Sequence, residues 1–404
     1  MRVIFLGLFY NPEEVELFLS KSSIGLEEAP NTLQLRILDG LLAQQDVQLT
    51  VLNSLPFGTF PKKYRQLFLK TRDWNYKGHP IHDLGYINLP WVKLKMREQE
   101  LYTSLCSILD KAGGEDTAIL AYSLYLPFLR VFRKLSRLYP KVHLSVIVTD
   151  LFGEYGLLPA NPVKRVLMDL YNTRLTSLYQ YPDSFVLLTE AMRDPLQVGD
   201  RPWCVVEGIA GGLPAPVSAS KSAEQKVILY AGTLQYEFGI RTLLQAFEQI
   251  EDPDYALWIC GSGEAADEIS ALSRKDPRIR FFGFVPKAEV NALQRQATVL
   301  VNPRQNEGEY VKYSFPSKTF EYLASGVPMI GYKLAGFPDD YDDCIFFVEG
   351  NSPEALRDRM VEVCSLSPEE RAAFAAHARS FVLENKNCVK QTGKMVNMIK
   401  GSFS

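Results

Sequence analysis

Residues 316–328 read Pro-Ser-Lys-Thr-Phe-Glu-Tyr-Leu-Ala-Ser-Gly-Val-Pro, and an apolar run at residues 297–303 precedes them. A second apolar run, at residues 327–332, follows at once. A strand, a helical segment and a second strand form the unit of a parallel sheet, because a parallel connection needs a crossover. The stretch therefore predicts a βαβ unit whose helix begins near Lys318.

Similar apolar runs with helical patterns between them recur on both sides of this unit, which is typical of parallel sheets covered on both faces. The first series comprises residues 2–9, 47–53, 117–123, 143–150, 184–190 and 203–208, and the second comprises residues 227–232, 256–261, 279–284, 297–303, 327–332 and 344–349. Residues 210–223, rich in Gly, Pro and small side chains, have the composition of a linker. We predict an α/β fold of two doubly wound Rossmann-like domains that face a central cleft.

The domain boundaries follow from these series. We expect an N-terminal domain at residues 1–209, the linker at residues 210–223 and a C-terminal domain at residues 224–384. A final helix within residues 385–404 exceeds what a six-stranded sheet needs, and it is expected to pack back on the first domain.

Composition narrows the class of protein. The 404 residues are 47% apolar and 23% charged, which is globular composition, and no run approaches the ~20 apolar residues of a membrane span. Six scattered cysteines show no metal spacing and suit a reducing cytoplasm. A net charge of −3 argues against nucleic acid as a partner. We expect a cytoplasmic protein.

Glycine turns follow the first strands of the second series. Gly232 ends one strand and precedes a helix that starts after Gly239, an arrangement that suits an anion because helix N–H groups point at the ligand. Gly261-Ser-Gly263 ends the next strand. Neither turn contains a full GxGxxG with a following acid, which disfavours a nicotinamide oxidoreductase.

These motifs together carry a family resemblance. The segment at residues 316–328, with Gly232, Gly239, Gly261-Ser-Gly263 and Phe282-Gly-Phe-Val-Pro286 in order, resembles the GT-B-fold retaining glycosyltransferases of family 4. The resemblance covers the C-terminal domain and, more faintly, the N-terminal one. It implies transfer of a hexose from a nucleotide diphosphate sugar, UDP rather than GDP, to a glycan or lipid-linked acceptor. It also implies a role in bacterial surface polysaccharide synthesis, with neither metal nor cofactor.

The resemblance also implies a donor site. A carboxylate should hold the ribose diol and cations should hold the diphosphate, which suits Glu321 and Lys318. Phe284 and Val285 would meet the base through main-chain atoms. The remaining expected donor contacts are the backbone N–H groups of Gly232 and Thr233 and the side chains of Arg304, Lys312 and Ser317.

Two departures from the family pattern concern this site. Thr233 and Phe238 stand where relatives carry Arg and Lys, so Arg304, Lys312 and Lys318 are expected to replace the lost charges. The E-x7-E spacing to Glu321 is also missing, because Tyr313 stands eight residues earlier. Excision of residues 309–314 restores the spacing and makes Glu307 the carboxylate that contacts donor-sugar hydroxyls. A solvated loop carboxylate is the alternative.

The N-terminal domain is expected to bind the acceptor. The loop that contains Ser23 and Gly25 matches the family's Gly-containing loop, and Asp150 stands where relatives often carry His. Asp150 is the candidate that contacts the donor sugar or the acceptor hydroxyl, and a turn cap is its alternative. The expected catalytic residues are Asp150, Glu307 and Lys318, with no obligatory base. The pairs Asp252-Pro-Asp254 and 339–343 are interpreted as turns and not as metal sites.

Residues 61–98 carry nine Lys and Arg against three acids, with Trp and Tyr interleaved. This composition suits an anionic membrane surface, and a surface excursion with core aromatics is the alternative. The expected location is therefore the cytoplasm, with peripheral contact at the inner face of the membrane.

Two rival functions stay open. The lost charges are compatible with a catalytically silent GT-B protein that binds nucleotide sugars or glycans. A nucleotide-sugar epimerase of the same fold would change the donor without any acceptor.

Overall fold

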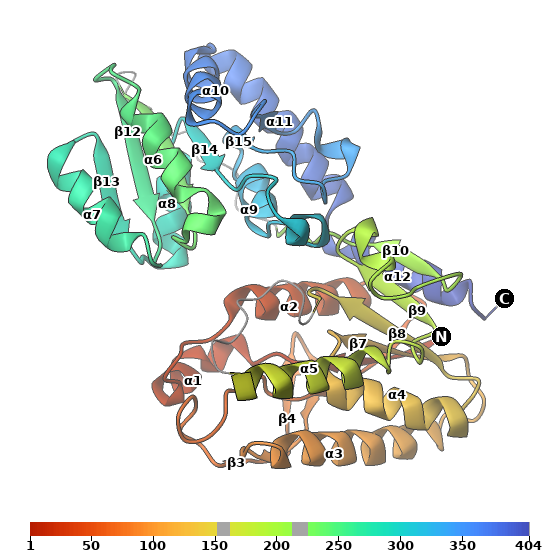
Figure 1. The fold of residues 1–404 in the computed structure, drawn as a ribbon. Helices are drawn as coiled ribbons and strands as arrows, with labels where there is room; N and C mark the ends of the chain where they lie inside the picture. The colour runs from red at the N-terminus through yellow and green to blue at the C-terminus, as the bar shows by residue number, and fades with distance from the viewer. Residues whose placement is uncertain (152–161, 212–224, 404) are drawn as a thin grey trace. The chain divides into compact units, whose positions relative to one another are not determined.

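The computed structural model describes residues 1–151, 162–211 and 225–403. The chain separates into two compact units, Met1–Ile209 with Cys388–Ser404 and Ala210–Asn387. Each unit is built around one main β-sheet (Figure 1). Each also has its own apolar core. Most of the predicted linker lies outside the described residues.

The first unit contains an eight-stranded sheet in the order β10-β9-β8-β7-β1-β2-β5-β4. All of its neighbouring strands are parallel except β4 and β5. Its strands are β1 (Arg2–Gly7), β2 (Gln48–Asn53), β4 (Arg72–Tyr76), β5 (His79–Asp83), β7 (Thr117–Tyr122), β8 (His143–Val148), β9 (Ser184–Leu187) and β10 (Trp203–Val205). A separate antiparallel pair consists of β3 (Phe68–Leu69) and β6 (Tyr86–Ile87).

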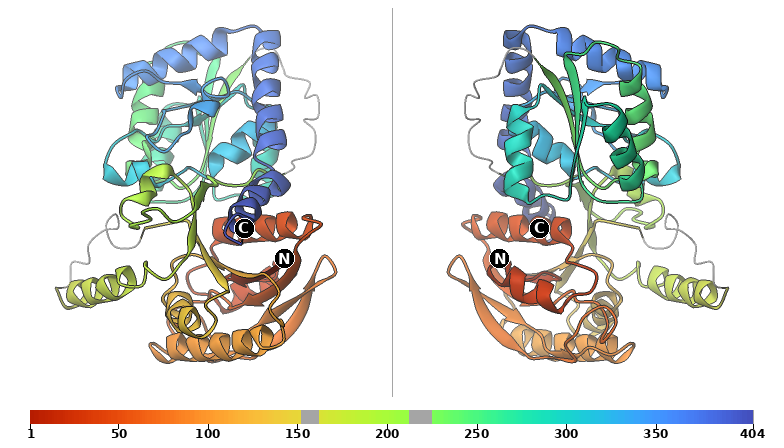
Figure 2. Two further views of the ribbon diagram at one scale, coloured as in Figure 1. Left: turned by 90° about the vertical axis from the view of Figure 1, so that its right-hand side faces the viewer. Right: turned by 90° about the vertical axis from the view of Figure 1, so that its left-hand side faces the viewer.

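Helices cover both faces of this sheet, and for this reason β7 and β8 are buried at every position. The helical elements are η1 (Pro12–Glu14), α1 (Val15–Lys21), α2 (Glu28–Leu42), α3 (Val92–Leu109), α4 (Leu126–Leu138), α5 (Pro162–Thr176), η2 (Glu190–Arg193) and α12 (Cys388–Lys400). Helix α12 packs against α2, so the end of the chain returns to the first unit (Figure 2). Its side chains Met395, Val396 and Ile399 are buried in the core of that unit.

The second unit contains a six-stranded parallel sheet in the order β13-β12-β11-β14-β15-β16. Its strands are β11 (Lys226–Ala231), β12 (Tyr255–Cys260), β13 (Ile279–Gly283), β14 (Val299–Asn302), β15 (Met329–Gly331) and β16 (Phe346–Phe347). Its helical elements are η3 (Tyr236–Phe238), α6 (Ile240–Glu248), α7 (Ala266–Lys275), α8 (Lys287–Gln296), η4 (Glu309–Tyr313), α9 (Lys318–Ser325), η5 (Asp339–Tyr341), α10 (Pro353–Ser365) and α11 (Pro368–Asn385). Helix α6 packs with α10, and α9 packs with α8 and α11.

Every strand that the sequence predicts is present in these two sheets. The hairpin of β4 and β5, which the sequence did not predict, adds two strands to the first sheet beside β2.

Candidate functional site

The second sheet has a topological switch point between β11 and β14. Strands β12 and β13 lie on one side of β11, whereas β14, β15 and β16 lie on the other. The connections on the two sides therefore run over opposite faces, and ligands of such sheets bind beyond the carboxyl ends of the strands at this point. Here these ends lead into Gly232 after β11 and into Pro303 and Arg304 after β14.

Tyr322 of α9 joins the helix to the end of β11. Strand β11 pairs with β14 only at Ile228 and Leu229. Beyond that point, the Ala231 N–H donates to the Tyr322 hydroxyl at 2.9 Å, and this hydroxyl lies 3.2 Å from the Ala231 carbonyl, to which it donates. Burial raises the pKa of Tyr322, so the phenol keeps the proton that it donates. The first turn of α9 is thereby fixed beside the Gly232 turn.

The Gly232 turn has no room for a side chain. A Cβ atom at position 232 would lie 2.6 Å from the Tyr230 hydroxyl and 3.0 Å from Cε of Lys318. The Tyr230 hydroxyl donates to the Thr233 carbonyl at 2.8 Å and fixes the turn. The Lys318 side chain therefore passes directly over the turn where a phosphate is expected.

Arg304 is held at the same edge. Its Nη2 donates to Ser314 Oγ at 3.0 Å, and its guanidinium lies 5.3 Å from the ring centre of Phe238 and 5.1 Å from that of Tyr310. Its positive charge opposes the rise that burial causes in the pKa of Tyr230, the neighbour of Lys318. Its Nε is buried and has no hydrogen-bond partner within the described part of the chain. Lys318 thus lies over the Gly232 turn, and Arg304 lies close enough for its charge to act on Tyr230, whose hydroxyl adjoins that turn.

The structure explains how residues 309–314 and Phe238 contribute. Residues 309–313 form η4, which supplies Tyr310, and Ser314 follows it. Together with Phe238 these side chains contact Arg304. The position that lacks the family's Lys therefore supports a different cation through its aromatic ring.

Two of the groups that were predicted to bind the phosphates have partners within the protein. The Gly232 N–H donates to the Cys260 carbonyl at 2.9 Å, so the prediction that this group is available to a phosphate was wrong. The reason is that Gly232 continues the hydrogen bonding between β11 and β12. Lys312 forms an ion pair with Glu309 and lies over the Tyr313 ring, which holds its ammonium within η4.

The predicted ribose and base contacts lie side by side. Glu321 of α9 forms an ion pair with Lys287 of α8, with 3.1 Å between Nζ and Oε1. Lys287 follows Phe284, Val285 and Pro286 directly, so the ion pair joins this loop to the carboxylate. The Phe284 ring is 78% exposed, and Gly283 before it turns the chain with φ +66°. Lys287 was not predicted from the sequence, because a Lys at a helix start has no distinctive pattern.

Glu307 and Ser317 lie at the same carboxyl edge of the sheet. Glu307 is exposed in the loop after β14, and its charge contributes to the raised pKa of Tyr332, the residue after β15. Ser317 is the exposed residue that precedes α9. Both positions are accessible to a ligand.

In the first unit, the loop after β1 is held by three side-chain amides. Leu8, Phe9 and Tyr10 donate their N–H groups to Gln34 at 2.7 Å, Asn53 at 3.0 Å and Asn31 at 2.8 Å, respectively. Gln34 and Asn53 also donate to the carbonyls of Leu8 and Phe9. This loop lies at the switch point of the first sheet, between β1 and β7, and its backbone donors are occupied.

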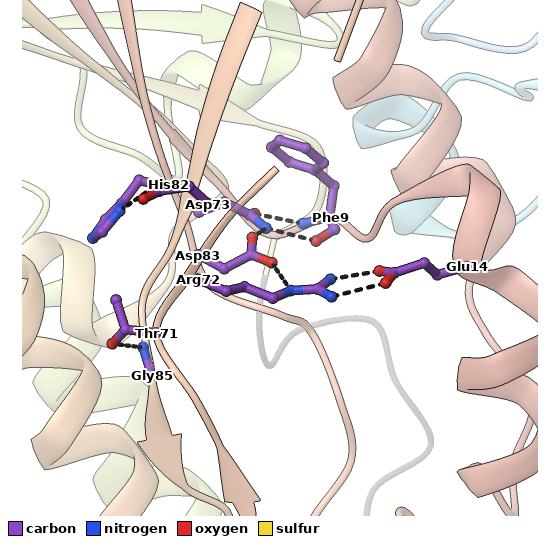
Figure 3. Close-up of polar contacts among 9 residues, drawn as sticks. Phe9, Glu14, Thr71, Arg72, Asp73, His82, Asp83 and Gly85 are labelled. Atoms are coloured by element: carbon purple, nitrogen blue, oxygen red, sulfur yellow. Dashed lines mark hydrogen bonds and ion pairs between the residues drawn. The ribbon is translucent and has the colours of Figure 1, made fainter. Parts of the chain in front are cut away.

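A buried polar network fixes the neighbouring segment (Figure 3). The fully buried carboxylate of Asp83 accepts from Asn53 at 2.6 Å and from Arg72 Nε at 3.0 Å. The other guanidinium nitrogens of Arg72 donate to both oxygens of Glu14, at 2.9 and 2.6 Å. Burial raises the pKa of Asp83, and the hydrogen bonds from Asn53 and Arg72 oppose this rise. The network joins the β4–β5 hairpin to the start of α1.

The predicted acceptor loop follows α1 and contacts the segment at residues 61–98. The Ser23 N–H donates to the Lys63 carbonyl at 3.0 Å, and the Ser22 hydroxyl donates to the Gly25 carbonyl at 2.7 Å. Gly25 has φ +78°, a conformation that side chains disfavour. Ser23 and Gly25 are both exposed.

Asp150 lies just beyond the carboxyl end of β8, near a second acid. The residue is exposed, yet desolvation raises the pKa of its carboxyl, and the negative charge of Glu27 adds to the rise. A hydrogen bond with Thr149 opposes it. Glu27 precedes α2, so the first sheet presents two carboxylates at its carboxyl edge.

Residues 61–98 divide between core and surface. Tyr64, Tyr86 and Arg97 are buried, whereas Phe68 and Trp91 are 60% and 68% exposed. Some aromatic side chains of this segment are therefore core residues, whereas others lie on the surface. Among the described residues, no helix is long and apolar enough to cross a membrane, and no cluster of three His, Cys, Asp or Glu could hold a metal.

Comparison with known proteins agrees with this architecture. A solved structure of an α,α-trehalose-phosphate synthase (UDP-forming) from Burkholderia xenovorans, in complex with glucose-6-phosphate, superposes with a TM-score of 0.65 over 99% of this chain and all of that one, at 11% identity. The chain therefore has the GT-B fold of glycosyltransferases, which confirms the predicted fold class.

Sequence comparison narrows the class. The family model described as "Glycosyl transferases group 1" matches residues 225–365, within the second unit. The D-inositol 3-phosphate glycosyltransferase of Corynebacterium glutamicum (strain R) is 30% identical over 173 residues, 39% of this chain and 40% of that protein. The O-antigen chain mannosyltransferase B of Escherichia coli is 27% identical over 180 residues, 42% and 45% of the two chains. The chain spans less than half the length of these curated relatives. The family model relates the second unit to group 1 glycosyltransferases.

Proposed function

We propose that this protein is a retaining glycosyltransferase of family 4 that moves a hexose from a nucleotide diphosphate sugar to a glycan or lipid-linked acceptor. The observation that carries the proposal is the pair of cations at the switch point of the second sheet: Lys318 lies over the Gly232 turn, and the charge of Arg304 acts on Tyr230, which adjoins that turn. Two cations at a crowded turn suit a diphosphate, and the adjoining Glu321 suits a ribose diol.

The site residues have different roles in the proposed transfer. The bond from the sugar C1 to the diphosphate breaks, and the bond from C1 to the acceptor oxygen forms on the same face. Arg304, Lys318 and the N-terminus of α9 stabilise the negative charge that develops on the diphosphate. The acceptor proton passes to an oxygen of the leaving diphosphate, so the protein needs no obligatory base and no metal.

Carboxylates take the remaining roles. Glu321 binds the ribose hydroxyls, with Lys287 as its partner when no nucleotide is bound. Glu307 accepts hydrogen bonds from the donor sugar. Asp150, with Ser23 and Gly25 on the acceptor side, contacts the acceptor hydroxyl or the sugar.

The nucleotide and the pathway are drawn from relatives. UDP is proposed because the trehalose-phosphate synthase of the same fold is named as UDP-forming. A role in bacterial surface polysaccharide synthesis is proposed because one relative is an O-antigen chain mannosyltransferase. The protein would act in the cytoplasm, and exposed Phe68 and Trp91 within the basic segment support peripheral contact with the inner face of the membrane.

A silent binding protein is the main alternative, because Thr233 and Phe238 lack the charges of family members. The contacts of Arg304 with Phe238 and Ser314 favour a working clamp over this alternative, since they hold a replacement cation in place. An epimerase of the same fold is the other alternative.

The test begins with calorimetric titration of the purified protein with UDP, GDP, ADP and CMP. Binding of one nucleoside diphosphate is expected, and its sugar derivatives are then incubated with and without sugar acceptors. Release of nucleotide that depends on an acceptor, with the product's anomeric configuration retained by NMR, supports the proposal. Binding without turnover indicates the silent protein, and a changed donor sugar without acceptor indicates an epimerase. Vesicle flotation with anionic and neutral lipids tests the membrane contact.

A further inference from the structure

Arg97 of α3 is a buried cation that has no acidic partner among the described residues. Only 5% of the residue is exposed. Its Nη1 donates to the Tyr125 hydroxyl at 2.7 Å, its Nη2 donates to the Leu55 carbonyl, and its guanidinium lies 4.0 Å from the ring centre of Tyr86. Its Nε is buried without a hydrogen-bond partner in the described ranges. Burial of a charge is costly unless an opposite charge compensates it, and here the neighbours are neutral.

Two further cations adjoin Arg97. Lys93, one turn earlier on α3, is partly buried and donates to the Phe57 carbonyl at 3.3 Å. Burial lowers the pKa of Lys93 to about 8, and the charges of Arg97 and Lys63 contribute to the lowering. Lys63 is exposed, and its side chain lies against Gly58. Within the described residues none of the three cations forms an ion pair with a carboxylate.

The position of this cluster matches the ligand edge of the first sheet. Leu55 and Phe57 follow β2, and Tyr125 follows β7, which are the two strands that flank β1. The Lys63 carbonyl also accepts from Ser23 of the predicted acceptor loop. The cations therefore gather where a doubly wound sheet binds its ligand, and not on a remote surface.

We propose that Lys63 and Lys93, backed by the buried charge of Arg97, bind a phosphate or diphosphate group of the acceptor. The inference rests on the proposed function, since it names the acceptor class of that transfer. Lys93 and Lys63 reach the anion directly, and Arg97 supplies positive potential from behind through a medium of low dielectric. An anion completes the cluster, because it relieves the repulsion among three cations that have no acid between them.

The test is calorimetric titration with inorganic pyrophosphate at constant ionic strength, in protein saturated with the nucleoside diphosphate that it binds. Saturation blocks the donor cations Arg304 and Lys318, so the remaining binding reports the second site. Wild-type protein is expected to bind pyrophosphate. Lys93→Gln should weaken this binding about tenfold, and Lys63→Gln should weaken it too. Lys95→Gln is the matched control, because Lys95 is an exposed cation on the same helix, and it should leave binding unchanged.

Several outcomes separate the possibilities. Pyrophosphate binding that is absent, or equally weakened in Lys93→Gln and Lys95→Gln, overturns the proposal. Far-ultraviolet circular dichroism checks that each variant folds, and the exposed Lys63 provides a second test if Lys93→Gln does not. If no nucleoside diphosphate binds, the proposed function fails. The titration is then repeated in Lys318→Gln protein without nucleotide, where dependence on Lys93 still supports an anion site.

The source of the phosphate is resolved in a second arm. Phosphatidylcholine vesicles with a small share of a prenyl diphosphate lipid are sedimented with wild-type protein and with the Lys93→Gln and Lys95→Gln variants. Recruitment that requires Lys93 but not Lys95 assigns the site to a lipid-linked acceptor. Pyrophosphate binding that requires Lys93, without such recruitment, assigns it to a soluble phosphorylated acceptor.

Discussion

The Tyr322 hydroxyl bonds to both backbone groups of Ala231, accepting from its N–H at 2.9 Å and lying 3.2 Å from its carbonyl. Strand β14 has diverged from β11 at this position, so the phenol replaces the missing strand as partner. One side chain of α9 thus satisfies the buried end of β11 and fixes the helix that carries Lys318 and Glu321. The geometry of the proposed donor site depends on this contact.

Tyr322→Phe is expected to lower both stability and nucleotide affinity. The change leaves two buried backbone groups without partners, which costs about 2 kcal/mol. Nucleotide affinity should fall because α9 loses its fixed position beside Gly232. Thermal unfolding and calorimetric titration measure the two effects. Tyr255→Phe is the control, since Tyr255 is also buried and its hydroxyl has only a 3.4 Å contact with Lys226. Equal effects in the two variants would show that the Ala231 contact has no special role.

Removal of either clamp cation should weaken diphosphate binding selectively. Lys318→Gln and Arg304→Gln are each expected to raise the Kd of the nucleoside diphosphate about tenfold or more, and that of the monophosphate less. Lys312→Gln should have little effect, because Lys312 pairs with Glu309. Calorimetry with the diphosphate and the monophosphate provides the comparison. A larger loss in Lys312→Gln than in Arg304→Gln would assign the phosphate contact to η4 instead.

The ribose assignment predicts a change in sugar discrimination. Wild-type protein should bind the ribonucleoside diphosphate more tightly than its 2′-deoxy form, because the Glu321 carboxylate accepts from the diol. Glu321→Ala should remove this preference, and Lys287→Met should keep it, because the carboxylate is then released from its 3.1 Å ion pair. Competition titration with the two nucleotides measures the ratio. If Glu321→Ala preserves the preference, Glu321 does not bind the ribose.

Particular residues show what the sequence could and could not predict. All strands of both series were predictable because covered parallel strands are continuous apolar runs. The β4–β5 hairpin was not predicted. Exposure alternates along Arg72–Tyr76, and the Lys77-Gly78 turn follows, but the charged residues of the segment conceal this strand pattern in the sequence. The burial of Arg97 and Asp83 was not predictable either, because their partners are distant in sequence. Arg97 contacts Leu55 and Tyr86. Asp83 accepts from Asn53.

The same limit applies to the candidate donor site. The Pro-Ser-Lys segment predicted Lys318 and Glu321 as donor-site residues. Contacts across the fold were not predictable, which is why the occupied Gly232 N–H and the Lys287 ion pair emerged only from the structure. A residue type indicates the chemistry that is possible, but its hydrogen-bond partners depend on the three-dimensional packing.

The acid pair of Glu27 and Asp150 predicts a shift in the pH profile. If Asp150 acts as a carboxylate, transferase activity rises with pH through its pKa, which desolvation and then Glu27 raise. Glu27→Gln removes a neighbouring negative charge, lowers this pKa and moves the acidic limb of kcat/KM to lower pH. Initial rates across pH 4 to 8 test this, with Glu28→Gln as control. An unmoved limb excludes interaction between the two acids during turnover.

The charge of partly buried Lys93 is expected to destabilise the folded protein at neutral pH. Its pKa is about 8 in the folded chain and 10.5 in the unfolded reference, so below pH 8 both states are protonated and the folded state bears the cost of a buried charge. Between these values the folded chain has released a proton that the unfolded chain keeps, and stability from this group therefore increases with pH.

Lys93→Met should consequently be more stable than wild type at pH 7, by about 1–2 kcal/mol, and this gain should shrink as the pH approaches 10. Urea unfolding at pH 7 and pH 10 measures it, with the exposed Lys95→Met as control, for which no such gain is expected. A less stable Lys93→Met at pH 7 would mean that the contact with the Phe57 carbonyl outweighs the burial cost. Such a destabilising lysine at the ligand edge of the sheet fits an anion-binding role. A bound phosphate compensates the buried charge, so the folded protein is stabilised when the anion binds.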